Sequence, residues 1–183
     1  MKYYLLQYKP FLLFLLKFFL TYGILTFLYQ GYLNSFGFDK IDGITQAVGR
    51  NTKQLLDLFG APFSFDKNEN ESYLRLFYDG KYVARIIEGC NSVSVLILFV
   101  SFVVSFSGTL KATLLFLFGG VALIYILNAV RIAVLCVLLF YFPEQEAFLH
   151  RIFFPLFIYG FVFLLWILWI SNFSKYAKKN TPV

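Results

Sequence analysis

The sequence predicts an all-α integral membrane helical bundle of about four transmembrane helices, with a small extracytoplasmic α+β segment made of one helix and a β-hairpin. Of its 183 residues, 60% are hydrophobic and only 14% are charged, which is too apolar for a soluble domain of this length. Several apolar runs reach the roughly 20 residues that a membrane-spanning helix needs. Most acidic residues fall within residues 33–89. We therefore expect a single membrane domain over residues 1–183.

The expected spans follow the apolar runs. They cover residues 10–32, 91–107, 112–142 and 149–171, and a basic cytoplasmic tail occupies residues 172–183. The third run is interrupted only by Asn128 and Arg131. We favour one long or kinked helix there, because two short helices would add a crossing and place the lysine-rich tail outside, against the positive-inside rule.

Residues 33–89 have the composition of a polar segment outside the bilayer. Asp42 is expected to cap a helix from Gly43 to Phe59. The apolar face of this helix would consist of Val48, Thr52, Leu55, Leu56 and Phe59. Two strand-like runs follow, and the Asp79-Gly80 pair between them is a strong hairpin signal. The segment is too small to fold alone, so we expect it against the outer ends of the helices.

Charge sets the expected orientation. The N-terminal lysines, Lys111 and the lysines of the tail should face the cytoplasm. The first helix then runs outward, and residues 33–89 lie outside. A rise of about 1.5 Å per residue places Arg131 about 30 Å from Lys111, at the outer boundary of the bilayer. Cys90, Arg131 and His150 are therefore expected at one outer membrane face.

Cys90 lies where the polar segment meets the second apolar run. A helix N-terminus favours the thiolate form of a cysteine, which is the nucleophilic form. The alternative is an inert, buried small residue. Cys136 lies within an apolar run and is interpreted as a packing residue.

Arg131 and His150 are the other candidate catalytic residues. An arginine in an apolar run is energetically expensive and is usually functional or paired. Asn128 lies one turn earlier and could orient the guanidinium; the alternative is a structural partner of Glu88 or Glu144. His150 is the only histidine, so imidazole acid–base chemistry must use it unless it is incidental.

Together these residues form a sufficient set for acyl transfer: a cysteine nucleophile, an imidazole base and an arginine that stabilises an oxyanion. The two cysteines and one histidine have no metal-ligand spacing, so we expect no metal site. The net charge of +6 is scattered beside apolar runs, which indicates membrane orientation and not nucleic-acid binding.

The ordered motifs resemble the exosortase/archaeosortase family. They are Glu88-Gly89-Cys90-Asn91-Ser92, then Asn128-Ala129-Val130-Arg131-Ile132, then His150. The short overall form resembles the exosortase F-type branch. The resemblance implies a cysteine transpeptidase or protease of the bacterial cytoplasmic (inner) membrane that cleaves C-terminal sorting signals of exported proteins. It assigns catalysis to Cys90, Arg131 and His150, with Glu88, Gly89, Asn91 and Asn128 in support, and it implies no cofactor.

The sequence departs from the family pattern after the cysteine, and the resemblance also implies binding partners. Many family members have Ser-Gly after the cysteine, where this chain has Asn91-Ser92. The implied partners are membrane lipid and secreted proteins that end in a short motif, a transmembrane helix and a basic tail. That helix would pack beside the second and third spans, where Gly119-Gly120 permits close approach.

A function from another class stays open. The chain could be a non-enzymatic membrane assembly or export factor. In that case Arg131, Glu88 and Glu144 would form a structural network at the outer face, and Cys90 would be incidental. A plain protease that hydrolyses its thioacyl intermediate would use the same residues as a transpeptidase.

Overall fold

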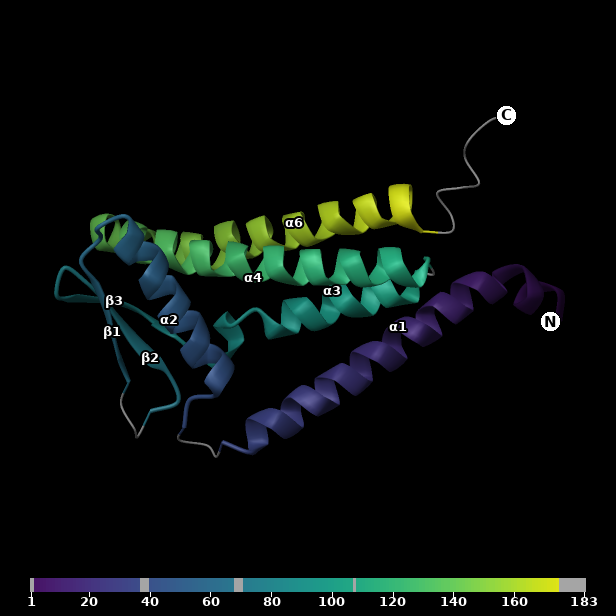
Figure 1. Ribbon diagram of the computed structural model, residues 1–183, viewed down its shortest axis with the longest axis horizontal. Helices are drawn as coiled ribbons and strands as arrows, with labels where there is room; N and C mark the ends of the chain where they lie inside the picture. The colour runs from purple at the N-terminus through teal and green to yellow at the C-terminus, as the bar shows by residue number, and fades with distance from the viewer. Residues whose placement is uncertain (1, 37–39, 68–70, 107, 175–183) are drawn as a thin grey trace.

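The computed structural model describes residues 2–36, 40–67, 71–106 and 108–174, with side chains from residue 8 onward. Most of the expected basic tail over 172–183 lies outside the described residues. The described chain is mostly helical (Figure 1). Its long helices are α1 (Lys2–Asn34), α4 (Leu110–Tyr141) and a last helix assembled from η2 (Pro143–Gln145), α5 (Glu146–Phe148), η3 (Leu149–Phe153), α6 (Phe154–Leu168) and η4 (Trp169–Phe173).

Three of the described helices are long and apolar enough to cross a membrane. They are Tyr8–Asn34, Leu110–Tyr141 and Pro143–Phe173. The chain is thus a multi-pass membrane protein. The run expected at 91–107 forms α3 (Val93–Ser105), which has 13 residues. It is about 20 Å long at 1.5 Å per residue, so a fourth span stays a prediction.

The helices run back and forth along the molecule. The start of α1 and the end of the last helix lie at one end, and α2 (Gly43–Leu58) and the strands lie at the other (Figure 1). At the first end, the Trp169 indole donates to the Phe106 carbonyl at 3.3 Å, just beyond α3. Helix α4 begins next to it, at Leu110, and runs unbroken to Tyr141. The described chain therefore has one long helix, Leu110–Tyr141, where the sequence predicted a long or kinked helix over 112–142.

The polar segment contains a three-stranded antiparallel sheet. It consists of β1 (Phe63–Lys67), β2 (Leu74–Tyr78) and β3 (Lys81–Ile86), in the order β1-β2-β3. The hairpin is confirmed: Asp79 and Gly80 take φ values of 49° and 72°, as a tight hairpin turn requires. The sequence missed β1, because its five residues offer only Phe63 and Phe65 as an alternating apolar pattern.

Helix α2 (Gly43–Leu58) begins at the expected cap. An Asp42 carboxylate oxygen accepts hydrogen bonds from the backbone N–H groups of Ile44 and Thr45, both at 2.9 Å. The prediction that Phe59 belongs to the apolar face is wrong. The helix ends at Leu58, and the Phe59 side chain points outward and is 80% exposed.

The polar segment packs on the second half of α4. One core cluster joins α2, the sheet and α4 through buried side chains that include Val48, Leu56, Phe63, Leu74, Leu76, Ile86, Ile132, Ala133 and Cys136. The Asn51 amide also donates to the Tyr125 hydroxyl of α4 at 2.8 Å. The segment therefore shares its core with the helices, as its small size requires.

A second cluster joins α3, α4 and the last helix around Phe99, which is fully buried. A Cβ at Gly120 would lie 2.2 Å from the Phe99 ring, so Gly120 is there to admit this ring. The close approach expected for a substrate helix at Gly120 is therefore taken by the protein's own α3. A Cβ at Gly119 would meet no atom within 4 Å.

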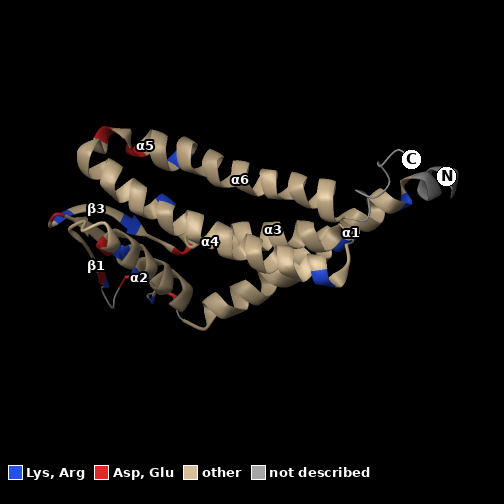
Figure 2. Cartoon of the chain, turned by 45° about the horizontal axis from the view of Figure 1, so that its top comes forward, with Lys and Arg blue, Asp and Glu red and all other residues tan. Residues whose placement is uncertain are grey.

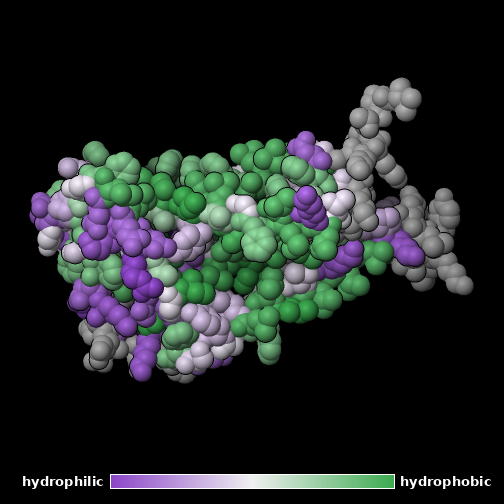
Figure 3. Space-filling view, in the orientation of Figure 1, coloured by the Kyte–Doolittle hydropathy of each residue, from purple (hydrophilic) through white to green (hydrophobic). Residues whose placement is uncertain are grey.

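The polarity of the surface differs between the two ends of the molecule. Hydrophobic side chains cover most of the visible surface along the helices, and hydrophilic side chains gather at the sheet end (Figure 3). Every described Asp and Glu lies within residues 42–88 or 144–146, at that same end (Figure 2). Lysines flank the other end, with Lys111 just after the start of α4. This is the charge asymmetry of a membrane protein with one polar face.

Candidate active site

Cys90 lies in an irregular turn between the sheet and α3. The cysteine turn, residues 87–92, starts with Ile87 and continues as a short 3₁₀ helix, η1 (Glu88–Cys90). Ser92 then takes a φ of 66°, in the left-handed region, and α3 begins at Val93. Non-glycine residues seldom adopt this conformation, and such strain is often found at functional sites.

Ser92 stands where the resemblance expects a glycine, and its backbone conformation suits glycine. Glycine adopts a positive φ without steric cost, whereas serine does not. The glycine of the Ser-Gly pair that many members carry would therefore fit this position. The Ser92 hydroxyl is buried and has no hydrogen-bond partner among the described residues.

A polar network holds the cysteine turn from the side of α1 and α2. The Tyr29 hydroxyl donates to Glu88 Oε1 at 2.9 Å and accepts from Asn91 Nδ2 at 2.8 Å. The Asn91 amide also donates to Thr45 Oγ1 at 3.1 Å, and the Thr45 hydroxyl donates to Asp42 at 2.5 Å. The residues on either side of the cysteine are thereby fixed to both helices.

Helix α4 holds the turn from the opposite side. The buried Asn128 amide donates to the Cys90 carbonyl at 2.8 Å. Its oxygen accepts from Arg131 Nη1 at 3.4 Å, so Asn128 joins the two candidate catalytic residues. Arg131 also lies over the Phe154 ring, with 5.9 Å from its guanidinium carbon to the ring centroid. Its buried Nε has no hydrogen-bond partner in the described chain, which leaves a donor free.

Cys90 and His150 line the same cavity. This cysteine cavity has a volume of about 640 Å³ and is bounded by β3, α4 and the start of the last helix. His150 lies in η3, a single π-helical turn, and is exposed. Such turns occur frequently at functional sites. Within the described part of the chain the His150 imidazole has no hydrogen-bond partner, so it is available to a ligand.

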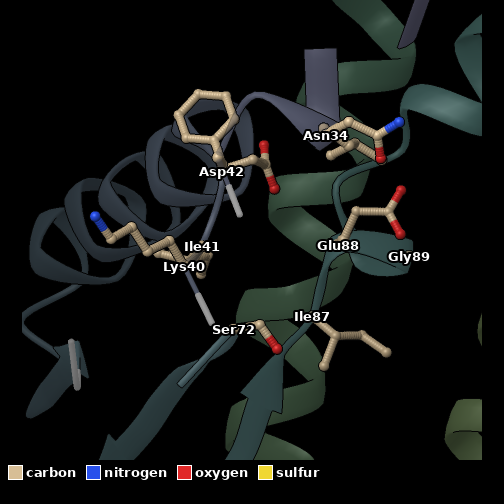
Figure 4. Close-up of a pocket in the computed structure, with 10 residues that line it drawn as sticks. Asn34, Lys40, Ile41, Asp42, Ser72, Ile87, Glu88 and Gly89 are labelled. Atoms are coloured by element: carbon tan, nitrogen blue, oxygen red, sulfur yellow. The ribbon is translucent and has the colours of Figure 1, made fainter. Parts of the chain in front are cut away.

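A second cavity borders the cysteine turn near the end of α1 and the start of α2 (Figure 4). This Glu88 cavity has a volume of about 590 Å³, and its lining includes Asp42, Ile87, Glu88 and Gly89. Ile87 lines both cavities. A Cβ at Gly89 would meet nothing within 4 Å, so the backbone beside the cysteine faces open space. Residues of the cysteine turn thus line both cavities.

The structural network that the alternative function expects does not form among the described residues. Their ion pairs are Lys53 with Asp57 at 3.0 Å and Arg75 with Glu71. Hydrogen bonding to Glu71 raises the pKa of Arg75. Glu88 instead accepts from Tyr29, and Glu144 is exposed. Arg131 has an amide and an aromatic ring as neighbours, which leaves its charge without a carboxylate in the described chain.

Metal ligands do not gather in the described chain. No group of three or more His, Cys, Asp or Glu side chains there is placed to hold a metal ion. The polar atoms at the cysteine turn are amide, hydroxyl, guanidinium and single carboxylate groups. Such groups can orient a peptide or stabilise a negative charge.

The structure joins most of the candidate residues and adds others. Asn128 contacts Cys90 and Arg131, and His150 reaches the same cavity as Cys90. Nothing in the sequence pointed to Tyr29, because a tyrosine near the end of a membrane span is common at membrane interfaces. The contact between Asp42 and Thr45 could have been expected in part, because a capping aspartate often bonds to the third residue after it.

Comparison with known proteins agrees with these features. The family model described as transmembrane exosortase matches residues 5–170, which is well over half of the chain. No curated protein and no solved structure matches the chain. The family match spans α1, the polar segment, the cysteine turn, α4 and nearly all of the last helix. The chain therefore belongs to the transmembrane exosortase family.

Proposed function

We propose that this exosortase family member is a membrane-embedded cysteine transpeptidase or protease that cleaves C-terminal sorting signals of exported proteins. The observation that carries this proposal is the shared cavity of Cys90 and His150, beside the Asn128 link to Arg131. The family is associated with the processing of such signals. The residues proposed for acyl transfer lie at one end of the molecule.

The proposed reaction begins when the Cys90 thiol gives its proton to His150 and the sulfur attacks a peptide carbonyl carbon. The carbonyl oxygen becomes an oxyanion, and the guanidinium of Arg131 stabilises its charge. The carbon–nitrogen bond then breaks, and His150 gives a proton to the leaving amine. This step leaves a thioacyl-enzyme. An acceptor amine resolves it in transfer, or water resolves it in hydrolysis, with His150 taking the proton in either case.

The proposed topology has four crossings with the cysteine turn on the extracytoplasmic face of the inner membrane. Helix α1 ends at the sheet end, and α4 begins at the opposite end (Figure 1). The chain must return between them, and α3 makes this return. The lysines near the start of α1 and at Lys111 support a cytoplasmic location for that end.

The test is processing of a secreted protein that ends in a short motif, an apolar helix and a basic tail. We would co-express it with the wild-type chain, with Cys90→Ala or with Cys136→Ala, and measure the C-terminus by mass spectrometry. We expect no processing with Cys90→Ala and retained processing with Cys136→Ala. Equal processing by Cys90→Ala and the wild type would refute the nucleophile. The mass of the new C-terminus separates transfer from hydrolysis.

A further inference from the structure

Strand β3 is an edge strand with a free side. In the described sheet it pairs with β2 alone, and no other described element bonds to its backbone. An edge strand presents a row of unpaired N–H and C=O groups, which can pair with another extended chain. The opposite edge of the sheet is β1, which packs beside α2.

The cysteine cavity runs along this free side. Successive side chains of a strand point to opposite faces, so a cavity on one face would be lined by every second residue. The cavity is instead lined by four consecutive residues of β3, namely Tyr82, Val83, Ala84 and Arg85. This pattern places the cavity beside the strand's backbone edge.

The cavity leads from β3 to the candidate nucleophile. Beyond β3 its lining continues through Ile87 to Cys90. The opposite wall comes from the start of the last helix and includes Glu146 and His150. A chain lying along β3 would therefore reach the thiol at the end of the strand, with the imidazole facing it.

We propose that the peptide substrate binds as an added strand on β3, in an extended conformation, with its scissile carbonyl at Cys90. This inference rests on the proposed function, because it takes Cys90 as the nucleophile. Backbone hydrogen bonds to a sheet edge supply affinity without regard to side chains, while adjoining pockets supply selectivity. Because β3 itself runs toward Cys90, a substrate that passes from outside into the membrane runs parallel to it.

The test uses the full-length protein in detergent and chloromethyl ketone peptides built from alanine. The cysteine sulfur displaces chloride from such a probe and forms a thioether. Acetyl-alanine and acetyl-tetra-alanine chloromethyl ketones differ only in the length of backbone available to β3. A third probe carries N-methyl groups on the two middle amides of the tetrapeptide. Alternate N–H groups of a strand face its neighbour, so one of the two methyl groups must block a bond.

We expect the tetra-alanine probe to modify Cys90 about tenfold faster than the single-residue probe, because two or more backbone bonds form. The N-methylated probe should fall back to the single-residue rate. Equal rates for all three probes would refute binding of the substrate as an added strand, while the assignment of Cys90 as the nucleophile would still hold. They would also fit an edge covered by a second copy of this chain. If no probe modifies Cys90, both proposals fail. The Cys90→Ala variant is the control for labelling at other residues.

Hydrogen exchange then locates the bound peptide. In protein modified by the tetra-alanine probe, backbone amides of 81–86 should exchange more slowly than in protein modified by the single-residue probe. Amides of 63–67, on the other edge of the sheet, should exchange equally in both. Slowing at 63–67 with no change at 81–86 would contradict binding on β3.

Discussion

Two surroundings of a cysteine can be compared within one hydrophobic cluster. Cys90 and Cys136 belong to the same cluster and are both buried, with 9% and 0% of their surfaces exposed. Cys136 lies inside α4, five residues before its end at Tyr141, where the helix satisfies its backbone. Cys90 ends a 3₁₀ turn, borders a cavity and has its carbonyl bonded by a side chain from α4. The two cysteines differ in backbone conformation and backbone hydrogen bonding far more than in burial. This difference separates the candidate nucleophile from a packing residue.

The polar contacts around the two cysteines differ in the same way. The flanks of Cys90 carry Glu88 and Asn91, both bonded to Tyr29. The neighbours of Cys136 in the cluster are apolar, including Ile132 and Ala133. Buried polar groups are stabilising only when their hydrogen bonds are satisfied, so the network at the cysteine turn specifies one geometry for it.

Thiol labelling should give the largest contrast between the two regions. We expect iodoacetamide to modify Cys90 about a thousandfold faster than Cys136, because Cys136 becomes accessible only when the core opens. Mass spectrometry of the two cysteine-containing peptides over time measures both rates. Comparable rates in the folded protein would show that the cavity does not expose Cys90.

Arg131 lies on the helix of Cys136 but contacts the region of Cys90, so its substitution tests the link between them. Arg131→Lys keeps the charge and loses the forked geometry. We expect the processing rate to fall about a hundredfold, the scale of losing one oxyanion donor. Arg50→Lys, on the exposed face of α2, is the matched control. Full processing by Arg131→Lys would reduce the role of Arg131 to its charge.

The sequence predicted the fold where patterns are local and strong. Apolar runs gave the long helices, Asp42 gave the start of α2, and Asp79-Gly80 gave the hairpin. It missed β1 and misplaced Phe59, because a five-residue strand and the last residue of a helix depend on tertiary packing. The motif order pointed to Cys90, Asn128 and Arg131. Only the fold could show that Tyr29, far away in the sequence, holds the turn beside the cysteine.

Tyr29→Phe would test whether the network around Cys90 is needed for its geometry. The change removes one hydroxyl that bonds both Glu88 and Asn91. Asn91 keeps its bond to Thr45, and the half-buried Glu88 carboxylate loses its Tyr29 donor. We expect a loss of about 1–3 kcal/mol in the free energy of unfolding, measured by thermal denaturation in detergent. The rate of Cys90 labelling should change, and that of Cys136 should not. Tyr22→Phe, on an exposed position of α1, is the control and should leave both unchanged.

Ser92→Gly should give the smallest effect and separates backbone strain from side-chain chemistry. Glycine relieves the positive φ but adds disorder to the unfolded chain, so we expect a gain of about 0.5 kcal/mol in the free energy of unfolding. The same change at Ser94, inside α3, should instead cost about 0.5 kcal/mol, because glycine weakens a helix. Opposite signs at these two positions would show that the turn after Cys90 is built on a conformation that suits glycine. A loss at both would mean that the Ser92 hydroxyl, and not the backbone, is what the turn requires.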